Sequence, residues 1–245
     1  MTEPVALPAM SGAQAASWHT LMDIHERFPA HWTLVGGQMV HLLCAEHGAT
    51  PERPTEDADT VLDVRAARDM LSQFTSLLTD LNFRPDTSGD GLQHRWRRQA
   101  DGAQVDVLLP DGVGLRTAAR RGVGGAPTLE TPGGSQALAR SESVTVTVQG
   151  RTGQVRRPNL IGALVMKAAA HSAVGDSGKA RHRRDFVTLA GLVAARDFRT
   201  VDLKPKDRQR LRAIIACTRE DPSVMLGQPG AEQHLSRVER GAKLL

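Results

Sequence analysis

The stretch of residues 32–64 constrains this chain more than any other, because it combines two adjacent glycines with two closely spaced aspartates. It opens with a short apolar run that ends at Gly36 and Gly37. An amphipathic segment follows, and a second apolar run then begins at Asp57 and Asp59. Residues two apart on a strand share one face, so both carboxylates should point at the same place. A fold tolerates two like charges at one point mainly when a cation lies between them.

The two glycines are typical of a turn that lies close to a ligand. Glycine lets the backbone approach a ligand closely. The helix predicted after Gly37 would present free N–H groups and the positive end of its dipole, which suit a phosphate. A phosphate-binding turn beside paired metal-binding carboxylates indicates phosphoryl or nucleotidyl transfer. The alternatives are a plain turn for the glycines and a turn before a strand for the aspartates.

Three further charged residues are candidates for the same chemistry. Asp106 lies between Val105 and Val107 in the middle of an alternating stretch, where an acid has no turn to stabilise. Lys167 and Asp185 lie on two predicted helices. The alternatives are a lysine that extends along an amphipathic helix to reach solvent and a surface ion pair of Asp185 with a nearby arginine.

Composition is that of a soluble globular protein with one large domain or two small ones. The chain has 245 residues, of which 40% are hydrophobic and 24% charged, so it can bury a sizeable core without staples. Aromatic residues make up 3% and tyrosine is absent, so we do not expect a base-stacking platform of several rings. The two cysteines, Cys44 and Cys217, lie on apolar helical patterns and are both expected to be buried.

Hydrophobic periodicity predicts a mixed α/β part followed by a helical part. In the first part we predict helices over 13–28, 37–47 and 66–81, and strands over 32–35, 57–64, 104–109, 141–149 and 154–157. The segment 111–135 is expected to be loop apart from a short helix over 115–121. After Pro158 we predict helices over 159–171, 179–195, 205–219 and 232–245. The expected fold class is α+β, with a mixed β-sheet domain over 1–157 and a helical bundle over 158–245.

Targeting signals are missing from the residues at hand. Residues 1–14 have no basic region and no long apolar run, which is unlike a signal peptide. No stretch of about 18 apolar residues exists, so we expect no membrane span and a cytoplasmic location.

Positive charge gathers in four clusters. The formal net charge is +4, and the clusters are HRWRR at 94–98, RTAARR at 116–121, RTGQVRR at 151–157 and KARHRR at 179–184. Clustered arginine suits phosphate and nucleic acid. The alternative is a composition set by a GC-rich genome, with the arginines on solvated faces.

In this order and spacing, the motifs resemble a known superfamily. Gly36-Gly37, Asp57-x-Asp59 and the later Asp106 resemble the polymerase-beta-like nucleotidyltransferases. A narrower resemblance, to the AbiEii/AbiGii-type toxins, covers about residues 32–192. It is carried by Arg53-x-Thr55-x-Asp57-x-Asp59, by Lys167, and by Arg183-Arg184-Asp185-Phe186 with Leu189. Many relatives have Ser or Thr after the second glycine, where this chain has Gln38, so a γ-phosphate contact would fall to backbone N–H groups or to the Gln38 amide.

The resemblance implies a fold, an activity and a set of roles. The fold would be of the nucleotidyltransferase type, and the activity would be transfer of a nucleotide from an NTP to RNA, notably the 3′ end of tRNA, with the arginine clusters as the RNA surface. Such enzymes are toxins of two-gene antiphage or stress systems, so a cognate antitoxin protein would be a partner. Asp57, Asp59 and Asp106 would bind two Mg²⁺ ions, for which Mn²⁺ could substitute. Lys167 would neutralise the triphosphate. Asp185 would orient Lys167 or a neighbouring arginine, or position the nucleotide.

Two other functional classes fit parts of the pattern. A small-molecule nucleotidyltransferase, such as an antibiotic-modifying enzyme, would line its acceptor pocket with acids, whereas the helical half here is basic. A catalytically silent binding module should have lost at least one carboxylate, and all three are present.

Overall fold

Two β-sheets form the N-terminal part of the chain. The computed structural model describes residues 3–52, 55–173, 178–199 and 201–244. The strands of the larger sheet are β2 (Trp32–Leu34), β3 (Ala58–Leu62), β4 (Arg84–Asp86), β5 (Arg95–Arg97), β6 (Gln104–Pro110) and β7 (Leu129–Thr131). Their order is β2-β3-β6-β5-β4, with β7 also paired to β6. The smaller sheet has the order β1-β8-β9 and consists of β1 (Val5–Ala6), β8 (Ser141–Val148) and β9 (Arg151–Pro158).

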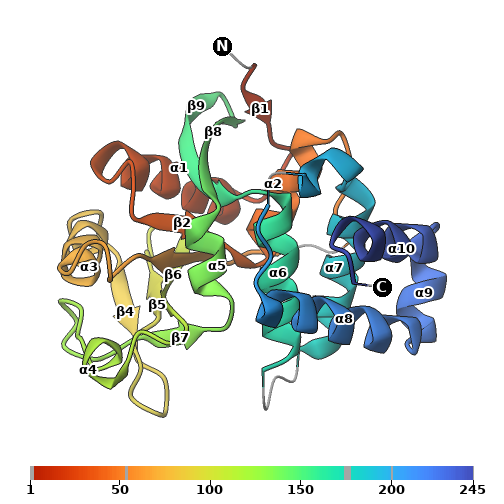
Figure 1. Ribbon diagram of the computed structural model, residues 1–245. Helices are drawn as coiled ribbons and strands as arrows, with labels where there is room; N and C mark the ends of the chain where they lie inside the picture. The colour runs from red at the N-terminus through yellow and green to blue at the C-terminus, as the bar shows by residue number, and fades with distance from the viewer. Residues whose placement is uncertain (1–2, 53–54, 174–177, 200, 245) are drawn as a thin grey trace.

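Helices surround the sheets and make up the rest of the chain. Those of the N-terminal part are α1 (Gly12–Arg27), α2 (Gly36–Glu46), α3 (Met70–Asp80), α4 (Leu115–Ala118) and α5 (Gly134–Ala139). The C-terminal part contains α6 (Leu160–His171), α7 (Lys179–Leu192), the 3₁₀ helix η1 (Ala195–Phe198), α8 (Pro205–Arg219), α9 (Pro222–Gly227) and α10 (Ala231–Gly241). Figure 1 shows the C-terminal helices gathered on one side of the molecule and the larger sheet with α3 on the other. The predicted α+β fold class is therefore confirmed.

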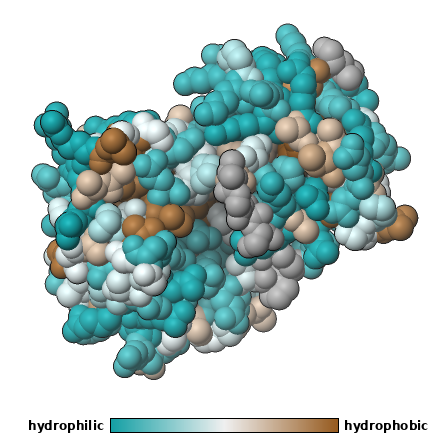
Figure 2. All heavy atoms as spheres, turned by 90° about the horizontal axis from the view of Figure 1, so that it is seen from below, coloured by the Kyte–Doolittle hydropathy of each residue, from teal (hydrophilic) through white to brown (hydrophobic). Residues whose placement is uncertain are grey.

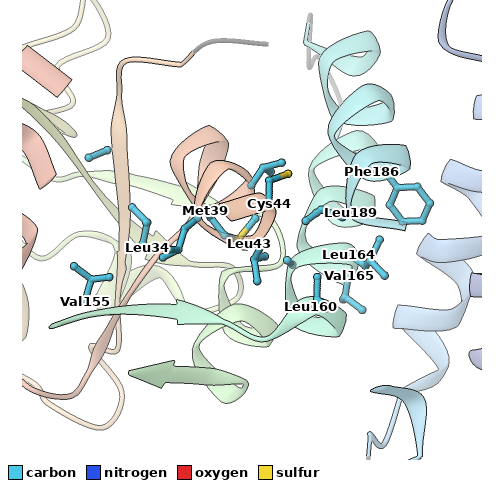
Figure 3. Close-up of a cluster of buried hydrophobic side chains, with 14 of the residues drawn as sticks. Leu34, Met39, Leu43, Cys44, Val155, Leu160, Leu164, Val165, Phe186 and Leu189 are labelled. Carbon is cyan, nitrogen blue, oxygen red and sulfur yellow. The ribbon is translucent and has the colours of Figure 1, made fainter. Parts of the chain in front are cut away.

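The sheet and the C-terminal helices share one hydrophobic core, and α2 lies at its centre. Met39 and Leu43 of α2 belong to the same buried cluster as Leu34 of β2 and as Leu164 and Leu189 of α6 and α7. Figure 3 shows these side chains converging from the three sides. Because close-packed side chains transmit position, the beginning of α2 is held at a fixed place relative to α6. The predicted domain boundary at residue 157 stays a prediction.

Local sequence signals explain where the helices begin. The Ser11 hydroxyl accepts a hydrogen bond from Gln14 N, and the Gln14 side chain returns one to Ser11 N, a capping box at the start of α1. Asn159 caps α6, since its side chain accepts a hydrogen bond from Gly162 N at 2.9 Å. Pro205 occupies the first turn of α8, where its missing N–H costs nothing.

Some sequence predictions were wrong in detail. The segment 111–135 contains β7 in addition to the short helix, and α5 begins at its end. A strand of three residues forms because β6 supplies its hydrogen bonds, so local periodicity does not reveal it. The helix expected over 66–81 begins only at Met70. Cys44 is buried as expected, whereas Cys217 is exposed on α8. None of the described helices combines the length and the apolar character that a membrane span requires.

Candidate active site

The carboxylates of Asp59 and Asp106 lie side by side because of strand register. β3 and β6 are parallel, and Asp59 pairs with Asp106 across them. β5 lies antiparallel on the other side of β6 and sets Arg95 opposite Asp106. Side chains in register on neighbouring strands point to the same face of a sheet. Asp57 immediately precedes β3 and reaches the same cluster. The sheet therefore brings together all three carboxylates that the sequence singled out, and it adds an arginine.

Arg95 and Gln104 hold two of the three carboxylates. Arg95 binds Asp106 bidentately, with Nε 3.1 Å from Oδ1 and Nη2 2.9 Å from Oδ2. The same Nη2 lies 3.4 Å from Oδ2 of Asp57. Gln104 Nε2 donates to Oδ1 of Asp57 at 2.6 Å. The sequence analysis placed Arg95 in a possible nucleic-acid surface and gave Gln104 no role. Only the pairing of β5 with β6 shows that both serve the carboxylate cluster.

The two glycines make room for the site's own side chains. Gly36 has a φ of +69°, and a Cβ there would lie 1.7 Å from Oδ2 of Asp59. A Cβ on Gly37 would lie 2.4 Å from Oγ1 of Thr55. Only glycine fits both positions, since no L side chain tolerates such approaches. Asp59 therefore packs against the first residue of α2, which sets the helix N-terminus beside the carboxylates, and the predicted approach of this turn to a ligand stays a prediction.

Gln38 supports the loop before Asp57. Its side-chain oxygen accepts a hydrogen bond from Trp18 Nε1 at 3.2 Å, and its amide nitrogen donates to the carbonyl of Thr55 at 2.9 Å. Gln38 is 3% exposed, and it is absent from the residues that line the pocket described below. The Gln38 amide thus bonds the Thr55 carbonyl, and the phosphate contact that the sequence left to this amide or to backbone N–H groups stays a prediction.

Lys167 and Asp185 form a buried ion pair. Lys167 Nζ lies 2.7 Å from Oδ2 of Asp185, and the two residues are each 4% exposed. Lys167 lines the pocket, whereas Asp185 lies behind it. Of the roles proposed for Asp185, the geometry matches the one in which it orients Lys167.

The glycines, the three aspartates, Arg95 and Lys167 border one pocket of about 310 Å³ between the larger sheet and α6–α7. A pocket of this size is at the lower end of the range that holds small ligands. Gly36, Gly37, the three aspartates, Arg95 and Lys167 line its polar part. Leu108, Leu129, Met166 and Ala170 line an apolar part, and Arg181 is an exposed residue of the lining. Figure 2 shows the molecule from below, with hydrophobic atoms gathered beside a central hollow on a mainly hydrophilic face.

Electrostatics in the pocket centre on Asp59. Burial raises the pKa of the Asp59 carboxyl to about 7, and the negative charges of Asp106 and Asp57 act in the same direction. The positive charges of Lys167 and Arg181 oppose the shift without cancelling it. Burial and like charges both disfavour the charged form of a carboxyl, and burial is the larger cause here.

The chemistry of the donors fits a hard divalent cation, but the side chains are not arranged as a closed metal centre. Carboxylate oxygens are the ligands that Mg²⁺ prefers. Within the described residues, no group of three or more His, Cys, Asp or Glu side chains is placed so as to hold a metal ion. Arg95 and Gln104 bind the oxygens of Asp106 and Asp57 in this structure. The oxygens of Asp57, Asp59 and Asp106 would suit Mg²⁺ or Mn²⁺ after Arg95 and Gln104 had moved away from them.

Three of the four arginine clusters, at 94–98, 151–157 and 179–184, contain arginines that pair with carboxylates of the fold. Arg151 pairs with Asp23 at 2.6 Å, and Arg157 pairs with Glu46 at 2.8 Å. Arg183 pairs with Asp221 at 2.6 Å. Arg156 donates to the carbonyl of Trp32 at 3.2 Å. The expectation that all four clusters form an RNA surface is therefore weakened, because an arginine held by a carboxylate offers less charge to a phosphate.

Comparison with known proteins supports the fold. No protein-family model and no curated protein matches the chain. An antigenic nucleotidyltransferase-like protein from Paracoccidioides brasiliensis is similar in structure, with a TM-score of 0.53, 17% identity, and 94% of this chain and 95% of that chain covered. The antibiotic-resistance factor ANT(2'')-Ia covers 86% of this chain and 94% of its own at a TM-score of 0.42 and 11% identity. The first likeness shows that this chain has a nucleotidyltransferase-like fold.

Replacement of Gly36 by alanine tests the packing of the glycine turn. Gly36→Ala combines backbone strain at positive φ, about 1–2 kcal/mol, with a clash against Asp59 that should add about 1–3 kcal/mol. Gly48, just beyond the other end of α2, has a φ of +64° and no atom within 4 Å of a built Cβ, so Gly48→Ala isolates the strain. Urea unfolding should show the larger loss for Gly36→Ala. Equal losses would show that Asp59 moves aside freely.

Replacement of Asp59 by asparagine tests the charge of the cluster. An acid whose pKa is higher in the folded state opposes folding above that pKa, and its effect fades as pH falls toward the unfolded value. Because the pKa of Asp59 rises from 3.8 to about 7, the wild type should lose at most about 4 kcal/mol between pH 4 and pH 8. With a chelator present, Asp59→Asn should therefore melt above the wild type at pH 8, and the gain should shrink toward pH 4. The same substitution at the exposed Asp80 should show no such trend, and an identical pattern there would contradict the assignment.

Proposed function

We propose that this protein is a metal-dependent nucleotidyltransferase that transfers a nucleotide from an NTP to an RNA acceptor. The observation that supports the proposal best is the placement of Asp57, Asp59 and Asp106 in one pocket with the buried Lys167. Three acids and a lysine from separate parts of the chain converge there, and the fold is nucleotidyltransferase-like.

Each group would have a defined task. Asp57, Asp59 and Asp106 would hold Mg²⁺, which when bound neutralises the triphosphate and activates the attacking hydroxyl. The N-terminus of α2 at Gly36 and Gly37 would face the phosphates with free N–H groups. Lys167 would neutralise phosphate charge, and Asp185 would hold the lysine in its buried position.

An RNA acceptor is favoured by charge on the pocket's outer edge and by the motifs. Arg181 is exposed, lines the pocket, and forms no ion pair within the described residues, and Lys179 is exposed one half-turn before it. Exposed cations beside a catalytic pocket suit an RNA backbone. The resemblance carried by Thr55, Lys167 and Asp185 favours the 3′ end of tRNA and a toxin controlled by a cognate antitoxin. Arg53, which belongs to the same motif, lies outside the described residues.

A small-molecule acceptor is the second candidate. It is favoured by the intramolecular pairing of Arg151, Arg157 and Arg183, which leaves less of the basic surface for a nucleic acid.

Incubation with each labelled NTP and Mg²⁺ tests the function and separates the two acceptors. With total tRNA, we expect the label to enter the RNA band of a denaturing gel, and a chelator or Asp59→Asn should abolish it. If label passes only to a panel of aminoglycoside-type small molecules, the RNA assignment is wrong. If no acceptor is labelled by a folded, metal-loaded protein, nucleotidyl transfer itself is wrong.

A double substitution tests whether Lys167 contacts the nucleotide. Lys167→Met alone takes the ammonium away from the buried Asp185 carboxylate, which should cost about 3–5 kcal/mol of stability. Lys167→Met with Asp185→Leu removes both charges and should regain most of that loss. NTP use by the double variant should stay reduced by roughly 10- to 150-fold, the equivalent of a charge-assisted hydrogen bond of about 1.5–3 kcal/mol. Recovery of both stability and NTP use would make the lysine purely structural.

A further inference from the structure

A guanidinium lies among the carboxylates at the position where a bound cation is expected. Arg95 takes both oxygens of Asp106, at 3.1 and 2.9 Å, and approaches one oxygen of Asp57 at 3.4 Å. Gln104 takes the other oxygen of Asp57 at 2.6 Å. The four oxygens of these two acids therefore already have donors.

We propose that Arg95 is a built-in counter-cation of the metal-free site, and that it leaves the carboxylates when the metal–nucleotide complex binds. This inference rests on the proposed nucleotidyl transfer and concerns how that site is regulated. Arg95 would act as a gate on metal binding, so that the metal and the nucleotide bind as a coupled pair.

Electrostatics make joint occupancy unfavourable. Two cations about 4 Å apart repel each other, and the repulsion grows with the charge of the ion and with burial. A divalent ion that used Asp57 and Asp106 would lie beside the guanidinium that uses the same oxygens. The ion and Arg95 therefore compete, and the metal affinity of the free protein is lowered by the strength of the Arg95 pairs.

The Arg95 side chain can move away from the carboxylates. Its side chain is 31% exposed, and the residue lines the pocket, so a change of rotamer moves the guanidinium toward the pocket while the strand stays paired. A triphosphate in that pocket offers phosphate oxygens to which a guanidinium binds bidentately. The nucleotide thus provides a new partner for Arg95 and bridging oxygens for the metal in the same event.

The coupling is reciprocal, which makes it measurable from either side. If the nucleotide raises the metal affinity by some factor, the metal raises the nucleotide affinity by the same factor. Removal of Arg95 should raise the metal affinity of the free protein, because the guanidinium no longer competes with the ion. The nucleotide should then increase the metal affinity by a smaller factor.

Binding of Mn²⁺ measured by calorimetry or electron paramagnetic resonance, with and without an α,β-methylene NTP analogue, tests the proposal. The variants are Arg95→Ala and Arg95→Gln, and the control is Arg97→Ala. Arg97 lies two residues along the same strand, is 54% exposed, and is 3.9 Å from its nearest acid, Asp86, so its loss changes net charge equally without touching the cluster. Circular dichroism establishes folding, and Arg95→Gln keeps hydrogen-bonding capacity if the alanine variant fails to fold.

The expected result is that nucleotide-free Arg95 variants bind Mn²⁺ at least tenfold more tightly than the wild type and Arg97→Ala, and that the analogue enhances their Mn²⁺ binding correspondingly less. Equal or weaker Mn²⁺ binding by folded Arg95 variants, with the wild type binding Mn²⁺ and analogue normally, would overturn the gate and leave the proposed function intact. Failure of the wild type to bind Mn²⁺ even with the analogue would overturn both.

Discussion

Mutual repulsion among Asp57, Asp59 and Asp106 is the constraint on which the rest of the site depends. Strand register forces Asp59 and Asp106 together, and the loop before β3 adds Asp57. Of the three, Asp106 is buried and Asp57 and Asp59 are half-buried, so their clustering calls for positive charge, which several elements supply. Arg95 comes from the neighbouring strand, and Lys167 comes from α6. Burial, and after it the charge of Asp106, raises the pKa of Asp59 to about 7, and Lys167 and Arg181 lower it by less.

The helix α2 connects this cluster to the rest of the molecule. The Asp59 carboxylate packs against Gly36, the first residue of α2, more closely than a Cβ at that position would allow. Thr55 packs against Gly37 in the same way. Its buried face packs between the sheet and α6–α7, as Figure 3 shows for Met39 and Leu43. The packing of α2 therefore fixes the strands that carry the acids relative to the helix that carries Lys167. A substitution in the core around α2 would therefore change the distance between the aspartates and Lys167.

The sequence predicted the features of the site that depend on local residue patterns. The structure added those that depend on strand pairing and on contacts between helices. The spacing of Asp57 and Asp59, and the mid-strand position of Asp106, were enough to predict that acids converge, because strand parity is a local property. Lys167 and Asp185 were found through motif order, and their ion pair needed two helices in contact. Arg95 and Gln104 were missed because their role follows from the β5–β6 register, which no periodicity encodes. For the same reason the sequence did not show that the Gln38 amide bonds the Thr55 carbonyl or that Arg157, counted in a basic cluster, pairs with Glu46.

A crystal structure with Mn²⁺ and an α,β-methylene NTP analogue tests the central claim most directly, because anomalous scattering locates the ion without reference to the protein. The account predicts a Mn²⁺ peak coordinated by Asp57 and Asp59, the triphosphate against Gly36 and Gly37, and Lys167 within hydrogen-bond distance of a phosphate oxygen. Mn²⁺ or triphosphate bound elsewhere, with Asp57 and Asp106 still held by Arg95 and Gln104, would contradict it.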